Sequence, residues 1–232
     1  MQAIHPRKGQ RSLRYLGLAV TLSLAFAAFT ASSASAVGIS ETVEYLVSGP
    51  NEATWTHSNS AISTIRCAKT GGSGTFTSST GGKFNVAMEG CNTKTFFGES
   101  ACTTPGQPSG TIKIYTGMRL VWLNAAHTEY GLLISPEPGI LTEVVCSYPV
   151  RHWEGSFLAK ITSPALNVRS KQASLLFQSK GPGVGAFQYE VEEGPFKGGF
   201  GPAAVNDENG TLSLDQKMTI TFNGGKEPKF IP

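Results

Sequence analysis

Met218-Thr219-Ile220-Thr221-Phe222 alternates apolar and hydroxyl side chains with a period of two. Successive side chains of a strand point to opposite faces of a sheet, so the three apolar residues share one face and the two threonines share the other. Thr111-Ile112-Lys113-Ile114-Tyr115 repeats the pattern, with its isoleucines on one face. Such alternation is typical of an antiparallel strand that has one face in a core and the other in water.

Similar short runs recur along the chain, and Gly and Pro separate them about every ten residues. The expected strands are Val43–Val47, Ile62–Cys67, Gly74–Thr77, Phe84–Met88, Thr111–Tyr115, Met118–Leu123, Tyr130–Ile134, Ile140–Cys146, Ser156–Thr162, Ala173–Phe177, Phe187–Val191, Thr211–Leu214 and Lys217–Phe222. No amphipathic helices alternate with these runs, which argues against a parallel α/β fold. The sequence predicts an all-β chain: a single antiparallel β-sandwich, or a related barrel, with about 10–13 short strands.

The first 36 residues have the layout of a secretory signal peptide. Basic residues precede the apolar run Tyr15–Ala31, and Ala34-Ser35-Ala36 then supplies the small residues at which signal peptidase cuts. We therefore expect cleavage after Ala36 and a secreted, extracellular protein. No second apolar stretch of about 18 residues follows, so we expect no membrane span after cleavage. Residues 37–60 are expected to form an N-terminal strand and linker, and residues 61–232 the β-sandwich domain.

The charge balance changes once the signal peptide is set aside. The whole chain has 19 Lys+Arg and 16 Asp+Glu, a formal charge of +3. Residues 1–36 hold four of the basic residues and no acidic one, so the remainder carries 15 basic and 16 acidic residues, a formal charge of −1. A near-neutral domain has no electrostatic footprint for nucleic acid or for an anionic membrane, and we expect neither as a partner.

Four cysteines follow the signal peptide, and an even number in an exported chain predicts two disulfides. Three pairings are possible. Cys91 and Cys102 lie 11 positions apart around a turn region, which favours a local bridge. Cys67 and Cys146 each end an apolar run, which favours a bridge between neighbouring strands or facing sheets. A metal site is not expected, because there is no C-x-x-C motif and no nearby pair of histidines.

Residues suited to catalysis are sparse. His57, His127 and His152 are the histidines beyond the signal peptide, and Asp207 and Asp215 are the two aspartates of the whole chain. No Gly-x-Ser-x-Gly elbow and no phosphate-binding motif occurs. We therefore predict a non-enzymatic protein without a cofactor. The alternative is an extracellular hydrolase with an unfamiliar site, which would need a pocket where His127 or His152 meets a serine and a glutamate.

Three glutamates lie close together in the sequence, Glu190, Glu192 and Glu193. On a strand, Glu190 and Glu192 would share one face while Glu193 takes the other. Like charges on one face favour a solvated surface over a catalytic pair of carboxylates, since nothing nearby supplies the apolar pocket that would raise one pKa.

The candidate ligand surface is Arg151-His152-Trp153-Glu154, which places charge, a titratable ring and an aromatic in four residues. The alternative interpretation is an ordinary strand or loop with a half-exposed tryptophan. A carbohydrate-binding or adhesive module is a second functional alternative. Its platform could be formed by Trp55, Trp122, Trp153, Phe96 and Phe97. It would be favoured if the tryptophans formed an exposed planar set on one sheet face.

The chain also resembles a group of uncharacterised secreted β-rich proteins of high-GC soil actinobacteria. The matching segments are Cys67-Ala68-Lys69-Thr70-Gly71, Gly90-Cys91, Ala101-Cys102-Thr103-Thr104-Pro105-Gly106, Gly131-Leu132 with Ser135-Pro136, Val145-Cys146, Ile161-Thr162-Ser163-Pro164 and the Met218–Phe222 strand. The resemblance spans most of residues 67–222 and rests on cysteine and turn positions. It implies a β fold with disulfides and no known activity. The combined expectation is a structural or binding role at or beyond the cell envelope.

Overall fold

The structure is a computed structural model that describes residues 36–49, 52–58, 64–95, 98–136, 139–147, 150–181, 183–190, 200–207 and 210–232. Within these ranges the chain is all β apart from one 3-10 turn, η1 (Asn223–Gly225). The strands are β1 (Gly38–Ile39), β2 (Val43–Gly49), β3 (Ala53–His57), β4 (Thr64–Cys67), β5 (Lys69–Phe76), β6 (Gly81–Glu89), β7 (Asn92–Thr95), β8 (Gly98–Ala101), β9 (Ile112–Trp122), β10 (Tyr130–Ser135), β11 (Thr142–Val144), β12 (Arg151–Gly155), β13 (Phe157–Ser163), β14 (Gln172–Phe177), β15 (Ser179–Gly181), β16 (Val184–Gly185), β17 (Gln188–Glu190), β18 (Phe200–Pro202), β19 (Val205–Asp207), β20 (Gly210–Phe222) and β21 (Phe230–Ile231).

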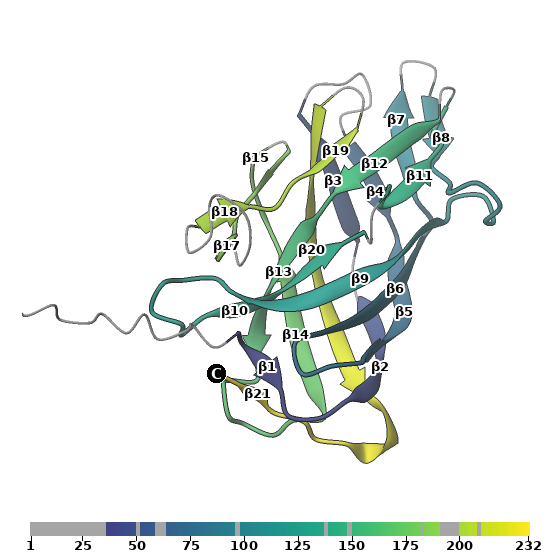
Figure 1. Cartoon of the computed structure of the whole chain (residues 1–232). Coiled ribbons are helices and arrows are strands. Elements are labelled where there is room, and N and C mark those ends of the chain that lie inside the picture. Colours follow the sequence, from purple (N-terminus) through teal and green to yellow (C-terminus); the bar gives the residue numbers. More distant parts are fainter. Residues whose placement is uncertain are drawn as a thin grey trace, which may run out of the picture. The chain divides into compact units, whose positions relative to one another are not determined.

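Eight of these strands pair into a closed ring. Their order is β14-β13-β10-β9-β6-β5-β2-β20, and β20 pairs with β14 to complete the circle (Figure 1). Every ladder in the ring is antiparallel. Closure leaves none of these eight strands with a free hydrogen-bonding edge along the ring. The prediction of an all-β, antiparallel fold is confirmed.

Side chains alternate across the ring as the sequence predicts. On β20, Met218, Ile220 and Phe222 are buried, whereas Thr219 and Thr221 are partly exposed on the outer face. The interior is filled mainly by aliphatic and aromatic side chains rather than left hollow. The ring of Phe157, for example, lies 6.4 Å from that of Phe84 and 5.5 Å from that of Phe177.

Two buried tyrosines place their hydroxyls on backbone carbonyls inside this core. Tyr45 donates to the carbonyl of Lys83 at 2.9 Å, and Tyr130 donates to the carbonyl of Pro164 at 2.5 Å. Burial raises the pKa of both phenols above the ordinary value, because the charged phenolate would lose its hydration. Phe230 of β21 packs against Tyr130.

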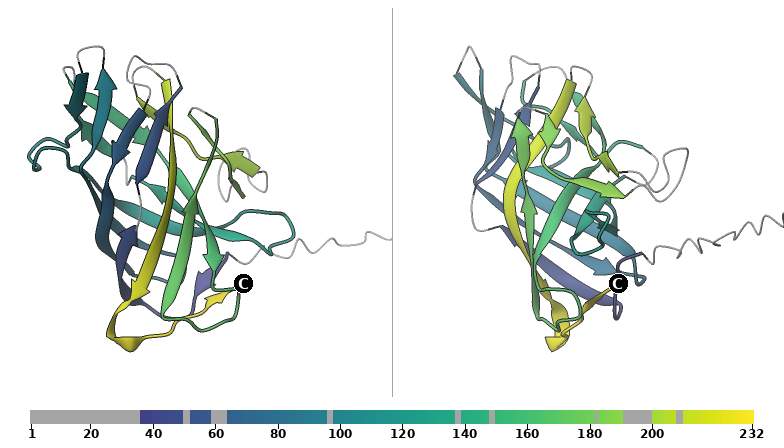
Figure 2. Two further views of the ribbon diagram at one scale, coloured as in Figure 1. Left: turned by 180° about the vertical axis from the view of Figure 1, so that it is seen from behind. Right: turned by 90° about the vertical axis from the view of Figure 1, so that its left-hand side faces the viewer.

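β20 is longer than the ring requires, and its first half builds an outer extension. Leu212–Asp215 pair with β3, and the sheet then continues through β4, β7 and β8. β19 pairs with the start of β20 and leads to β12 and β11. Figure 2 shows β20 as the long yellow strand that links this extension to the ring. The outer extension consists of β3, β4, β7, β8, β11, β12 and β19.

The expected disulfide pairing is wrong, although all four cysteines are bonded. The structure joins Cys67 to Cys91 and Cys102 to Cys146. The cause is strand register. The β5–β6 hairpin pairs Lys69 with Glu89, so the residues two positions beyond each end, Cys67 and Cys91, meet. In the same way, an antiparallel bridge between positions 103 and 145 brings Cys102 opposite Cys146.

A small cover layer is made of β15, β16, β17 and β18; β17 lies against β9, whereas β15 and β16 lie beside β20. On its outer face the ring presents apolar residues of β9, β10 and β13, and Val121, Leu133 and Leu158 form a second hydrophobic cluster with Ala203. Phe187 and Tyr189 pack onto this cluster. The second cluster explains why β9, β10 and β13 are buried on both faces.

The strand predictions differ from the structure mainly in length. Thr111–Tyr115 and Met118–Leu123 are parts of one strand, β9, and the last two expected strands are parts of β20. Residues 37–60, expected as a strand and linker, supply β1, β2 and β3, and β2 belongs to the ring. The predicted signal peptide lies outside the described residues apart from Ala36. Across the described ranges, no helix is long and apolar enough to cross a membrane.

Candidate functional site

The predicted ligand surface Arg151–Glu154 lies on β12, and the strand divides it between two faces. Trp153 is fully buried and contacts Trp55, with ring centroids 4.7 Å apart. The expectation that Trp153 contributes to a ligand surface is therefore wrong: the period of two turns it, with Arg151, toward the core. His152 and Glu154 remain exposed, and Nε2 of His152 lies 3.4 Å from Oε1 of Glu143.

Arg151 belongs to a buried ionic cluster. Its Nη1 lies 2.9 Å from Oδ2 of Asp207, and the other carboxylate oxygen of Asp207 lies 2.8 Å from Nε2 of His57. The side chains of Asp207 and His57 are 1% and 4% exposed. The cluster ties β12, β19 and β3 together. A buried carboxylate with partners on two other strands holds these strands in place, since losing Arg151 leaves the charge of Asp207 buried without its cation.

The three tryptophans do not form a binding platform. Trp55, Trp122 and Trp153 are all buried, so they do not form the exposed planar set that would favour a carbohydrate-binding module. Phe96 and Phe97, the other aromatic residues considered for such a platform, lie outside the described residues.

His127 meets a glutamate, as the hydrolase alternative requires. Its Nε2 lies 2.9 Å from Oε2 of Glu190, which joins the β9–β10 loop to β17 of the cover layer. The imidazole also stacks on Trp122, with centroids 4.8 Å apart and planes 12° apart. The backbone of His127 has φ of 52°, a conformation that costs a non-glycine residue energy. Glu192 and Glu193 lie outside the described residues.

The position of His127 favours a structural role. Its ring face is covered by Trp122, and the hydrogen bond that the described residues record for its side chain goes to Glu190 rather than to a serine. His127 itself lines an open cavity of about 530 Å³ together with Glu129, Tyr130 and Lys160 among others, and Lys160 and Glu129 form an ion pair there. Among the described residues, no group of three or more His, Cys, Asp or Glu could hold a metal ion.

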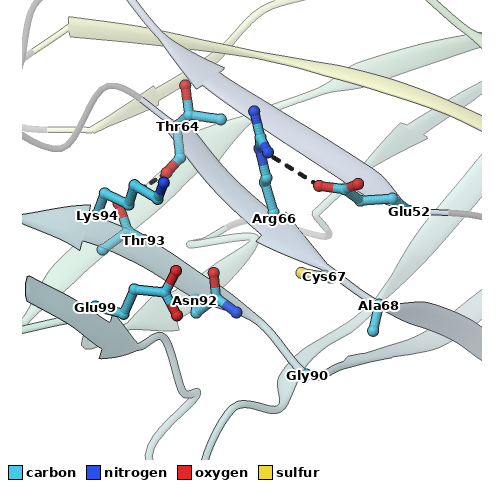
Figure 3. A pocket seen from close by; sticks show the side chains of 10 residues that line it. All are labelled: Glu52, Thr64, Arg66, Cys67, Ala68, Gly90, Asn92, Thr93, Lys94 and Glu99. Atoms are coloured by element: carbon cyan, nitrogen blue, oxygen red, sulfur yellow. Dashed lines mark hydrogen bonds and ion pairs between the residues drawn. The ribbon is translucent and has the colours of Figure 1, made fainter.

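A polar basin with a volume of about 610 Å³ lies on the outer extension (Figure 3). We call it the basin. Its lining residues come from the segments around β3, β4, β7 and β8: Glu52, Thr64, Arg66, Cys67, Ala68, Gly90, Asn92, Thr93, Lys94 and Glu99. A volume between about 300 and 1,000 Å³ is typical of sites for small molecules.

Strand register places the polar side chains of the basin. Arg66 of β4 lies opposite Asn92 of β7, and Lys94 of β7 lies opposite Glu99 of β8. Arg66 Nε is 3.4 Å from Oε1 of Glu52, and Figure 3 shows this pair on one wall, with Lys94 and Glu99 on the other side. The basin therefore presents two cations, two carboxylates and an amide on adjacent strands.

The floor of the basin is rigid. Cys67 and Cys91 are bonded to each other, and the hydroxyl of Thr93 donates to the carbonyl of Thr64 at 2.7 Å, which links β7 to β4. Paired strands next to a disulfide hold the backbone of these groups in place, so a ligand has to order only their side chains. Sequence reasoning missed these residues, because the register that brings them together links four strands and no local motif records it.

Comparison with known proteins adds no relative. The chain matches no protein-family model, no curated protein and no solved structure.

Proposed function

We propose that the protein is a secreted, non-enzymatic protein that binds a partner at or beyond the cell envelope through the basin. The observation that carries this proposal is the basin itself: an open polar cavity whose hydrogen-bonding groups stand on paired strands beside a disulfide. The closed ring, a barrel-like form of the predicted scaffold, would support the strands that carry the basin. Two disulfides support an exported location, since such bonds persist in oxidising compartments.

The division between scaffold and site supports binding rather than turnover. His57 is buried in the ionic cluster, and His127 is held by Glu190 and covered by Trp122. His152 lies on the exposed face of β12 beside Glu143. None of these histidines lines the basin. A hydrolase that uses one of these histidines would therefore need a catalytic site outside the basin.

The direct test uses the secreted protein and isolated cell envelopes of the organism that makes it. We expect the protein to sediment with the envelopes, and the pair of substitutions Arg66→Ala and Lys94→Ala to weaken this binding at least tenfold. A matched control removes two exposed charges away from the basin, Lys171→Ala and Glu227→Ala, which form a similar surface ion pair. Equal binding by both double variants would contradict the role of the basin.

A second arm tests the non-enzymatic part of the proposal. The secreted protein is screened against chromogenic ester, peptide and glycoside substrates. We expect no turnover. A reproducible turnover that is lost in His127→Ala, His152→Ala or Glu190→Gln, with thermal unfolding unchanged, would establish the hydrolase alternative.

A further inference from the structure

We infer that the ligand of the basin is an electrically neutral glycan, bound through neighbouring hydroxyl groups of its sugar rings. This inference rests on the proposed function, because it assigns a ligand class to the same site. It is carried by the pairing of carboxylates and cations around the cavity and by the cancellation of their charges.

The first step concerns the four charged side chains of the basin, of which Arg66 and Glu52 form an ion pair. Arg66 and Glu52 are 65% and 52% exposed, and their closest contact is 3.4 Å. Lys94 and Glu99 are cross-strand partners, and both are exposed. Exposed pairs of this kind contribute little to folding. Their carboxylate oxygens and N–H groups therefore remain available to a ligand in the cavity.

The second step concerns what such pairs can hold. A sugar hydroxyl donates one hydrogen bond and accepts others, so two neighbouring hydroxyls need acceptors and donors side by side. Glu52 and Glu99 can accept, while Arg66, Lys94 and the amide of Asn92 can donate. Hydrogen bonds to charged groups are stronger than those between neutral groups.

The third step concerns charge. The basin holds two cations and two carboxylates, so its formal charges cancel. A polyanion would be repelled by Glu52 and Glu99 about as strongly as it is attracted by Arg66 and Lys94. A polycation would be repelled by the two cations about as strongly as it is attracted by the two carboxylates. A ligand with many hydroxyls and no net charge avoids both repulsions. The balance of charge thus disfavours an acidic polysaccharide and a basic peptide, and it is compatible with a neutral glycan.

The test measures binding of the secreted protein to immobilised dextran, mannan and galactan as neutral probes, with polygalacturonate and polylysine as charged probes. We expect binding to at least one neutral probe and not to the charged ones. Glu52→Gln with Glu99→Gln, and Arg66→Gln with Lys94→Gln, should each weaken that binding at least tenfold. The control Lys171→Gln with Glu227→Gln should leave it unchanged. Thermal unfolding of every variant checks that the fold is intact.

A charge-reversal variant sharpens the result. Glu52→Lys with Glu99→Lys should lose binding to the neutral probe and gain binding to polygalacturonate, because the basin then holds four cations. Wild-type binding to polygalacturonate or polylysine alone would overturn the inference. Envelope binding that depends on Arg66 and Lys94, without binding to any neutral glycan, would overturn the inference but leave the proposed function standing. If the basin variants keep both envelope binding and binding to the neutral glycan, the inference and the proposed function are both refuted.

Discussion

Removing each disulfide separately tests the pairing and its contribution to stability. The Cys67–Cys91 bond closes a loop of 24 residues and the Cys102–Cys146 bond one of 44. The chain-entropy relation at 25 °C gives stabilisations of about 3.4 and about 4.0 kcal/mol, respectively. The logarithmic dependence on loop length makes the difference small, about 0.5 kcal/mol. We therefore expect two double variants of nearly equal stability.

The assay is urea unfolding of Cys67→Ala with Cys91→Ala and of Cys102→Ala with Cys146→Ala, together with the four single variants. For a chain of this size, a loss of about 3.4 kcal/mol lowers Tm by about 7–14 °C. Because the two bonds are expected to stabilise almost equally, all four single variants should lose similar stability, and peptide mapping under non-reducing conditions tests the pairing itself. A mapped peptide that links Cys91 to Cys102 would refute the pairing.

Three further results are expected. Asp207→Asn should cost about 3–5 kcal/mol in urea unfolding, because it breaks a buried ionic cluster, and a cost below about 1 kcal/mol would contradict that role. Ile220→Ala should cost about 2–5 kcal/mol and Thr221→Ala much less, since one faces the core and the other the surface; similar losses would contradict the register. The raised pKa values of the Tyr45 and Tyr130 phenols keep them protonated in the folded protein, so unfolding above the ordinary pKa of about 10 releases their protons. Stability should then fall by about 1.4 kcal/mol per pH unit for each phenol, and Tyr45→Phe should reduce this slope in alkaline unfolding curves.

The fold class follows from the sequence because the period of two is a local property. Met218, Ile220 and Phe222 alternate with threonines, and that alternation alone assigns them to the core. The same local pattern cannot show where one strand continues into the next. Thr116, for instance, interrupts the inward-facing apolar series between Ile114 and Met118, yet β9 runs through it without a break. Strand number and length therefore depended on the tertiary pairing.

The disulfide pairing could have been predicted from the sequence. If residues 69–89 are taken as one hairpin, antiparallel register makes Cys67 and Cys91 neighbours. The short separation of Cys91 and Cys102 suggested a bond between them, but the ten residues between them contain a hairpin of their own, β7 and β8. The backbone N–H of Cys102 does bond to the carbonyl of Cys91 at 2.9 Å, yet their sulfurs have other partners.

The candidate site could not have been predicted from the sequence. Arg66, Asn92, Lys94 and Glu99 come from three strands, and no spacing along the chain shows that they share a cavity. The segment that looked most suited to a ligand, Arg151–Glu154, was chosen for residue types that also suit a buried junction. A tryptophan and an arginine two positions apart on a strand point to the same side, and here that side is the interior.

The long strand β20 has a consequence for when the molecule can fold. Tyr45 of β2 pairs with Phe222 of β20, so the ladder that completes the ring joins segments far apart in the chain. Contacts between distant segments form slowly, because the chain between them must first be brought together. Until β20 has been synthesised, β2 and β14 each lack a neighbour on one side, and an unpaired edge invites association with other chains. The same delay keeps the polypeptide open during synthesis, which is the state a chain needs if it is threaded through a narrow export channel before it folds.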